Sequence, residues 1–102
     1  MTDLPKLIRD KIPEIIRESG DRPVTREVSD EEIEKWLRKK VLEEAKEFEE
    51  DGAIEELADL YAVVERYLEV EDTSFSKLER LEEDKSSERG GFKDNIVLED
   101  VE

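Results

Sequence analysis

Apolar positions recur along most of the chain at intervals of three and four residues, the spacing that places them on one face of an α-helix. A first long helix is predicted to open at Ser29, because Glu32 three residues later completes a capping box, and to cover about residues 30–50. Gly52 follows it, and glycine tolerates the left-handed backbone that ends many helices. A second helix is predicted over about residues 53–70, and the short connection makes the two an antiparallel hairpin.

The segment before this hairpin is mixed in character. Pro13 opens a short predicted helix that runs to Glu18, and Gly20 ends it. Residues 23–28 are expected to be extended, with a short strand as one outcome.

A third helix is predicted after the hairpin. Thr73 or Ser74 caps it, it stops before Gly90, and its apolar residues at helical spacing are Phe75, Leu78 and Leu81. The tail that follows carries Ile96-Val97-Leu98, which predicts a short strand or an arm lying over a neighbouring chain.

Together these elements predict one all-α domain over residues 1–102, an antiparallel helical bundle with short extended terminal segments. Leu, Ile, Val and Phe total 28 of 102 residues, which lies above the roughly 20% below which disorder is expected. A chain of this size buries only a modest fraction of its surface, so we expect oligomerisation to complete the bundle.

Composition excludes several classes of site. The chain has no Cys and no His, which excludes disulfides, zinc–thiolate sites, a Cys nucleophile and a Ser-His-Asp triad. The net charge of −15, from 32 acidic and 17 basic residues, argues against a nucleic-acid duplex as partner. No apolar run approaches the ~18 residues of a membrane span, and charges interrupt the N-terminal segment, so we expect no membrane association and a cytoplasmic location. Abundant Glu and Lys, with no Gln and a single Asn, resemble the composition of thermophile proteins.

Acidic residues interrupt the apolar faces of the predicted hairpin. Glu44 falls inside the stripe of the first helix between Val41 and Phe48, and Glu47 falls at its edge. Asp59 interrupts a second helix that is apolar almost all round. An isolated buried charge is very costly, so these carboxylates must be paired, protonated or bound to a metal ion.

The hairpin geometry brings the acidic residues to matching heights. With the turn centred between residues 51 and 52, Glu47 faces Glu56, and Glu44 faces Asp59. Four converging carboxylates are hard oxygen ligands that suit Mg²⁺ or Mn²⁺, and Mg²⁺ prefers sites that it shares with substrate phosphates. The same spacing marks a solvated helix face in other acidic pairs of this chain, namely Glu31/Glu34, Glu69/Asp72 and Glu79/Glu82.

Two acidic motifs resemble the signature of a known family. Leu42-Glu43-Glu44-Ala45-Lys46-Glu47 fits EExxE and Glu56-Leu57-Ala58-Asp59 fits ExxD, as in the MazG-like all-α nucleoside triphosphate pyrophosphohydrolases, relatives of phosphoribosyl-ATP pyrophosphohydrolase. Residues 6–16 (KLIRDKIPEII) resemble the opening of a compact single-domain subgroup, and residues 88–92 (ERGGF) resemble its closing motif. The resemblance covers nearly the whole chain.

The resemblance implies a homodimer or homotetramer that binds Mg²⁺, or Mn²⁺, through Glu44, Glu47, Glu56 and Asp59. Members of this family hydrolyse a nucleoside triphosphate to the monophosphate and pyrophosphate, and many remove non-canonical nucleotides as house-cleaning enzymes. We keep two alternatives: a non-catalytic acidic helical interaction module, and a phosphoribosyl-ATP pyrophosphohydrolase.

Further residues are candidates for roles in such a reaction. Without His, the proton acceptor is metal-bound hydroxide or a carboxylate, and the candidate carboxylates are Glu43 and Glu47. Trp36 and Tyr61 could stack on a base, the alternative being core or interface packing. The candidate contacts to the triphosphate, which could equally be surface ion-pair partners of Glu, are Arg9, Lys11, Arg89 and Lys93.

Overall fold

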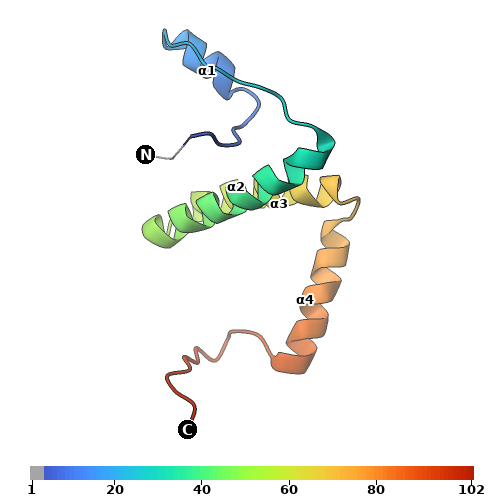
Figure 1. Ribbon diagram of the computed structural model, residues 1–102. Coiled ribbons are helices and arrows are strands. Elements are labelled where there is room, and N and C mark those ends of the chain that lie inside the picture. Colours follow the sequence, from blue (N-terminus) through green and yellow to red (C-terminus); the bar gives the residue numbers. More distant parts are fainter. Residues whose placement is uncertain (1–3) are drawn as a thin grey trace.

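A computed structural model describes residues 4–102, and its regular elements are all helices (Figure 1). They are α1 (Ile12–Glu18), α2 (Asp30–Asp51), α3 (Ile54–Val70) and α4 (Phe75–Arg89). No strand forms among the described residues, so the prediction of an all-α chain is confirmed.

The ends of α2 follow from the sequence. Ser29 Oγ accepts a hydrogen bond from the backbone N–H of Glu32 at 3.2 Å, as the capping box predicts. The Glu32 carboxylate instead lies 3.7 Å from Arg26 Nη1, so only one half of the box forms. At the other end Gly52 takes the left-handed conformation, with φ of +70°, and its N–H donates to the Phe48 carbonyl at 2.7 Å.

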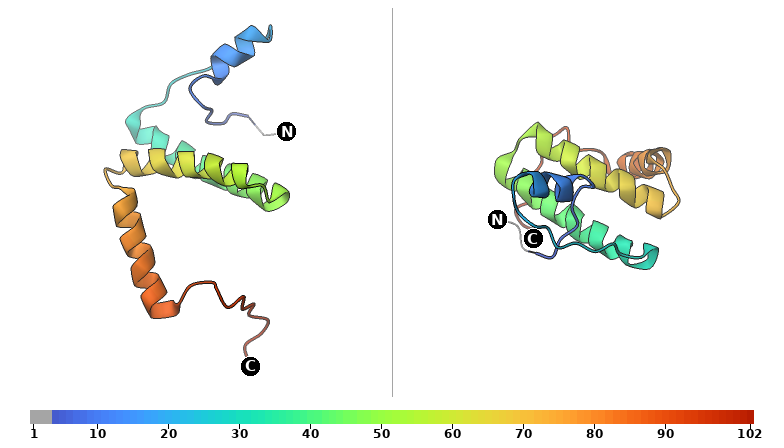
Figure 2. Two further views of the ribbon diagram at one scale, coloured as in Figure 1. Left: turned by 180° about the vertical axis from the view of Figure 1, so that it is seen from behind. Right: turned by 90° about the horizontal axis from the view of Figure 1, so that it is seen from above.

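Helices α2 and α3 form the predicted antiparallel hairpin and lie side by side along their lengths (Figure 2). Only Gly52 and Ala53 connect them. Leu37, 2% exposed, is the one fully buried apolar side chain among the described residues, and Glu44, 7% exposed, is the one buried charged residue. Both lie on the predicted apolar stripe of α2, so the packed centre of the chain contains a carboxylate.

The extended segments form no strands, which corrects two expectations. Residues 23–28 are extended but have no neighbouring strand with which to form a ladder. Ile96-Val97-Leu98 also stays outside any sheet, with 78–84% of each residue exposed. Because β-structure requires hydrogen bonds to a partner strand, an extended propensity alone does not produce it.

Helix α4 projects away from the hairpin (Figure 1). Ser74, one of the two predicted caps, accepts a hydrogen bond from the N–H of Lys77 at 3.4 Å and so begins the helix. Leu78 and Leu81 remain 41% and 48% exposed, because α4 does not pack along α2 or α3. One copy of the chain therefore forms a helical hairpin with arms, and the predicted bundle is incomplete within it.

The overall dimensions agree with this open arrangement. The radius of gyration is 17.6 Å, against about 13 Å for a compact domain of this length. Among the described residues, no helix combines the length and the apolar character that crossing a membrane requires.

The hairpin turn provides a test of the fold. Gly52→Ala should lower the free energy of unfolding by about 1–2 kcal/mol, because a Cβ disfavours the left-handed backbone that the turn requires. Gly91→Ala is the matched control, since Gly91 has open space around its Cα and no positive φ. Urea unfolding of both variants at one protein concentration measures the difference; equal midpoints would contradict the role of Gly52.

Candidate metal centre

Three carboxylates from the two hairpin helices converge near the α2–α3 turn. Glu44 comes from α2, and Glu56 and Asp59 come from successive positions on one side of α3. One carboxylate oxygen of each lies within 4.8 Å of the others. The predicted facing of Glu44 and Asp59 across the hairpin is thus confirmed, and the three residues form what we call the acidic cluster.

Glu44 is the unusual member of the acidic cluster, because its side chain is buried. Its Oε1 lies 3.5 Å from Lys40 Nζ. Its Oε2 is buried, and no donor among the described residues reaches it. Leaving a buried acceptor unsatisfied costs about 1–3 kcal/mol, so contact with a cation or a proton would stabilise this oxygen.

The electrostatics of the acidic cluster favour binding of either protons or a cation. Burial raises the pKa of the Glu44 carboxyl to about 7, and Glu47 adds to the rise through a hydrogen bond and charge repulsion. Burial also raises the pKa of Glu56, with contributions from a hydrogen bond to Asp51 and from repulsion by Glu47. Near neutral pH, a proton and a cation therefore compete for the same oxygens.

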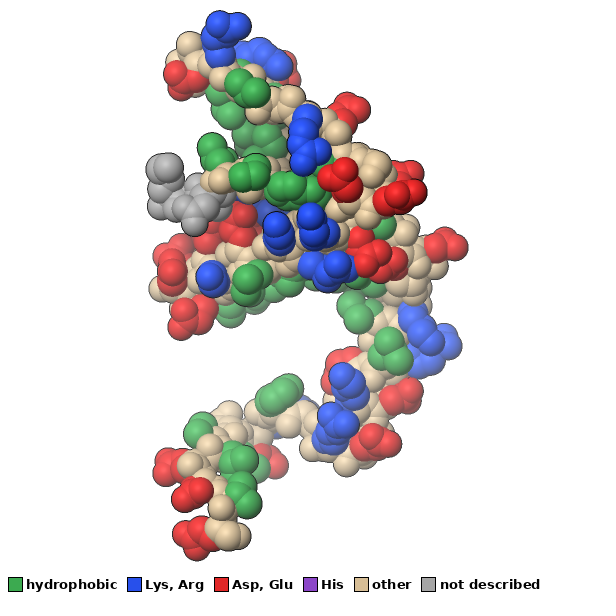
Figure 3. Space-filling view, viewed as in Figure 1, with side chains coloured by type: hydrophobic (Ala, Val, Ile, Leu, Met, Phe, Trp, Pro, Cys, Tyr) green, Lys and Arg blue, Asp and Glu red, His purple; other side chains and the backbone are tan. Residues whose placement is uncertain are grey.

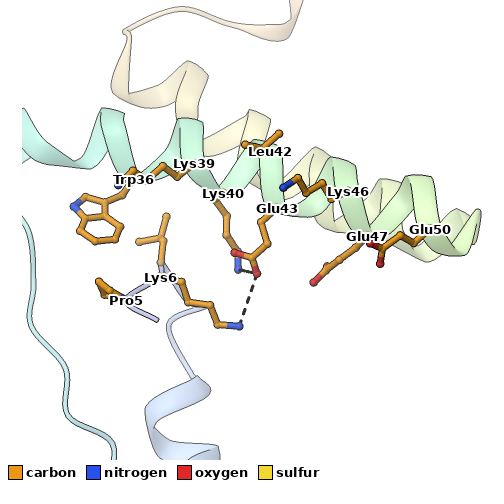
Figure 4. A pocket seen from close by; sticks show the side chains of 11 residues that line it. Pro5, Lys6, Trp36, Lys39, Lys40, Leu42, Glu43, Lys46, Glu47 and Glu50 are labelled. Carbon is orange, nitrogen blue, oxygen red and sulfur yellow. Dashed lines mark hydrogen bonds and ion pairs between the residues drawn. The ribbon is translucent and has the colours of Figure 1, made fainter. Parts of the chain in front are cut away.

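Glu47 lies beside the acidic cluster rather than within it. The sequence predicts four ligands, and the structure brings Glu44, Glu56 and Asp59 into one set that does not include Glu47. Its side chain extends instead toward the cavity between α2 and the N-terminal segment (Figure 4). Glu47 is nevertheless close enough to raise the pKa values of both Glu44 and Glu56.

This cavity has a volume of about 450 Å³, and its charged lining consists of four lysines and three glutamates. It lies between residues 5–7 and the outer side of α2 (Figure 4), and Glu47 on its wall is close enough to Glu44 and Glu56 to raise their pKa values. Its four lysines, which we call the lysine rim, are Lys6, Lys39, Lys40 and Lys46. Figure 3 shows Lys and Arg side chains gathered over this part of the hairpin, in a chain whose net charge is −15.

Glu43, a candidate proton acceptor, is engaged by the lysine rim. Lys40 Nζ lies 3.1 Å from its carboxylate, and Lys6 Nζ lies 3.8 Å away. The sequence analysis did not single out Lys40, although its spacing of three and four residues before Glu43 and Glu44 is visible in the sequence. These two ion pairs hold the Glu43 carboxylate in place on the cavity wall.

Of the two N-terminal residues predicted to contact the triphosphate, Arg9 lies at the acidic cluster and Lys11 does not. Arg9 Nη2 lies 2.9 Å from Asp59 Oδ1, which places this guanidinium at the edge of the acidic cluster. Both side chains are substantially exposed, so the pair itself stabilises the fold by no more than about 1 kcal/mol. Lys11 is the exposed residue before α1 and forms no ion pair among the described residues.

The C-terminal candidates do not reach the acidic cluster within one copy. Arg89 ends α4, which is about 22 Å long at 1.5 Å per residue, and Lys93 follows it. Because α4 starts beyond the far end of α3 and points away from the hairpin, both residues lie remote from Asp59 (Figure 1). Contact with a bound triphosphate would require a second copy of the chain.

The two aromatic candidates have different surroundings. Trp36 forms a wall of the cavity, with Lys39 Nζ 5.1 Å and Arg26 Cζ 5.7 Å from its ring centroid. Tyr61 instead stacks on Phe75, with centroids 4.8 Å apart and planes within 8°. Trp36 therefore remains available at the cavity, while one face of Tyr61 is already covered.

Comparison of the chain with protein-family models, with curated proteins and with solved structures found no match. The resemblance to the MazG-like family therefore rests on the motif residues alone.

The acidic cluster predicts pH-dependent binding of Mn²⁺. Between pH 6 and pH 8 the affinity should rise, because a cation must displace the proton that Glu44 retains up to a pKa of about 7. Titration calorimetry in two buffers of different ionisation enthalpy measures both affinity and proton release. Glu44→Gln should weaken binding by about tenfold or more, whereas Glu79→Gln, from an acidic pair outside the hairpin, should not. Equal affinities for the two variants would exclude Glu44 as a ligand.

Proposed function

We propose that this protein is a Mg²⁺-dependent hydrolase that converts a nucleoside triphosphate into the monophosphate and pyrophosphate, with removal of non-canonical nucleotides as its role. The observation that carries the proposal is the buried Glu44 carboxylate. Its Oε2 has no hydrogen-bond donor among the described residues, and one of its oxygens lies within 4.8 Å of carboxylate oxygens of Glu56 and Asp59. The motif resemblance agrees with it. A stability role alone would not favour burying this carboxylate, since an apolar side chain would serve better.

The donor set fits Mg²⁺ or Mn²⁺. All ligands are carboxylate oxygens, and the chain supplies no His or Cys that would favour zinc. Three carboxylates leave part of an octahedral shell for water and phosphate oxygens, which is the usual sharing of Mg²⁺ sites with nucleotides. When bound, such an ion polarises phosphate oxygens and lowers the pKa of a coordinated water.

The lysine rim provides the electrostatic counterpart to a triphosphate. Lys39 and Lys46 have no ion-pair partner among the described residues, whereas Lys40, from the same helix, and Lys6, from the N-terminal segment, pair with Glu43. Ammonium groups next to an acidic metal centre would neutralise phosphate charge that the acidic cluster alone would repel. Arg9, at the edge of the cluster, adds a guanidinium suited to bidentate phosphate contact.

Glu47 is the better of the two candidates for accepting a proton from the attacking water. Its side chain reaches the cavity beside the acidic cluster, and it forms no ion pair among the described residues (Figure 4). Glu43, by contrast, is held by Lys40 and Lys6. The two ion pairs fix the position of the Glu43 carboxylate, whereas no ion pair among the described residues restrains Glu47 from approaching a water beside the acidic cluster.

The proposal includes a homodimer or homotetramer acting in the cytoplasm, with stability suited to heat. The exposed apolar sides of α3 and α4 favour a second function, a non-catalytic interaction module. Phosphoribosyl-ATP is the third possibility and is one member of the substrate panel below.

The first test is release of pyrophosphate from a panel of triphosphates with and without Mg²⁺. Glu44→Gln and Asp59→Asn should each lower kcat/KM about 100-fold or more, because each removes a ligand charge from the acidic cluster. Glu79→Gln is the control and should retain the rate. Circular dichroism should show equal helix content in all variants. Absence of release from every substrate by the folded wild-type protein would favour the interaction module.

A second test concerns Arg9. Arg9→Ala should raise KM about tenfold with a smaller change in kcat, since removing one charge-assisted contact to phosphate costs roughly 1.5–3 kcal/mol. Binding of Mn²⁺ should be equal or tighter, because Asp59 loses its guanidinium partner. Arg17→Ala, on the exposed side of α1, serves as the control. Weaker Mn²⁺ binding with unchanged KM would show that Arg9 acts on the acidic cluster and not on the substrate.

A further inference from the structure

Residues 5–9, which we call the N-terminal strap, form one wall of the cavity beside α2. Pro5, Lys6 and Leu7 line the cavity from this side, and the other lining residues belong to α2 (Figure 4). Lys6 and Leu7 are only partly buried, and α1, which follows the strap, packs along no other helix of the described chain. The strap therefore depends on a few side-chain contacts for its position, and the cavity depends on the strap for one of its walls.

Two ion pairs connect the N-terminal strap to the hairpin. Lys6 Nζ lies 3.8 Å from Glu43 Oε1. Arg9 Nη2 donates a hydrogen bond to Asp59 Oδ1 at 2.9 Å. No other ion pair joins residues 4–20 to α2 or α3 within the part of the chain that the structure describes. Because Asp59 belongs to the acidic cluster and Glu43 does not, the Arg9 pair is the one that a cation at the cluster would affect directly.

The ion pair between Arg9 and Asp59 is weak enough to be broken by a divalent cation. The two side chains are 63% and 43% exposed, and ion pairs of such exposure contribute little to stability. A cation held by the acidic cluster would share the Asp59 carboxylate with the Arg9 guanidinium, and like charges repel strongly at that range. The guanidinium and the cation therefore compete for Asp59, and the more highly charged cation has the stronger attraction to it.

We propose that binding of a divalent cation to the acidic cluster releases the N-terminal strap and opens the cavity. Without a cation, Arg9 holds the strap at Asp59 and keeps the cavity wall in place. With a cation in the cluster, Arg9 leaves Asp59, and the strap moves away from α2. The freed guanidinium then meets an anion that enters the cavity, so the cation binds before the anion. This inference rests on cation binding, which is part of the proposed function, but not on hydrolysis of any substrate.

The first experiment measures the position of the strap by energy transfer from Trp36, the single tryptophan of the chain. Because the chain has no Cys, a dye on Glu14→Cys reports on α1, which follows the strap, and a dye on Glu65→Cys reports on α3. Saturating Mg²⁺ should lower the transfer to position 14 and leave the transfer to position 65 unchanged. An excess of unlabelled Trp36→Phe chains suppresses transfer between copies.

Variants of the labelled chain identify the residue responsible for the response. Arg9→Ala should show low transfer to position 14 already without Mg²⁺, and Mg²⁺ should lower it no further. Arg17→Ala is the matched control, because it removes the same charge from an exposed residue of α1 that forms no ion pair among the described residues, and it should keep the full response. Circular dichroism should show equal helix content in both variants.

Calorimetry tests the reciprocal effect that linkage requires. If the cation has to displace Arg9, the unlabelled Arg9→Ala chain should bind Mg²⁺ about two- to fivefold more tightly than the wild type, and Arg17→Ala should bind it equally. Unchanged transfer to position 14 on Mg²⁺ binding, or equal affinities of Arg9→Ala and the wild type, would overturn this inference alone. Absence of Mg²⁺ binding by the wild type would overturn the proposed function as well. Release of the strap without pyrophosphate release from any triphosphate would support this inference and refute the hydrolase.

Discussion

The arrangement of this protein depends on one desolvated carboxylate. Glu44 lies in the best-packed part of the hairpin, near the height where α3 presents Glu56 and Asp59. Burial, together with a hydrogen bond and charge repulsion from Glu47, raises its pKa to about 7, and no donor from residues 4–102 reaches its Oε2. The fold therefore holds an oxygen ligand in an environment that it would leave if the surrounding packing relaxed. A cation bound among the three carboxylates would reduce their mutual repulsion and would give Glu44 Oε2 a contact. Such binding would offset the cost of burying this carboxylate.

The tight turn sets the geometry that makes this possible. Gly52 ends α2 with a left-handed backbone and leaves Ala53 as the only other connecting residue, so positions before and after the turn meet in a fixed register. A longer connection would allow the two helices to slide and would separate Glu44 from Asp59. The same register places Glu43 and Glu47 toward the cavity, where Lys40 and Lys6 balance Glu43. Helix α2 thus carries Glu44 of the acidic cluster and, on an adjacent side, three of the four lysines of the cavity.

Features fixed by local sequence could be predicted, whereas those fixed by distant contacts could not. The Ser29 cap, the Gly52 turn and the facing of Glu44 and Asp59 depend on residues close in sequence or on one short connection. Three of four expected ligands consequently fall together. The position of Glu47 outside that set depends on how each side chain rotates at the edge of the packed interface, which helical spacing does not determine. Arg89 is remote from the acidic cluster because α4 points away from the hairpin. The direction of α4 could not be predicted from the spacing of its apolar residues, because α4 packs along neither α2 nor α3 within one copy.

Helix α3 has two different sides, one facing the acidic cluster and one apolar and exposed. One side of it holds Glu56 and Asp59 toward α2, and another carries apolar residues that remain exposed, with Ile54 at 73% and Leu57 at 38%. A helix that is apolar around most of its circumference is stable only when it is covered on more than one side. Among residues 4–102, Leu37 is the single fully buried apolar residue, so the hairpin of an isolated chain has little packing with which to hold Glu44 desolvated. A partner that covered the exposed apolar side of α3 would supply that packing, so its binding and cation binding would each strengthen the other.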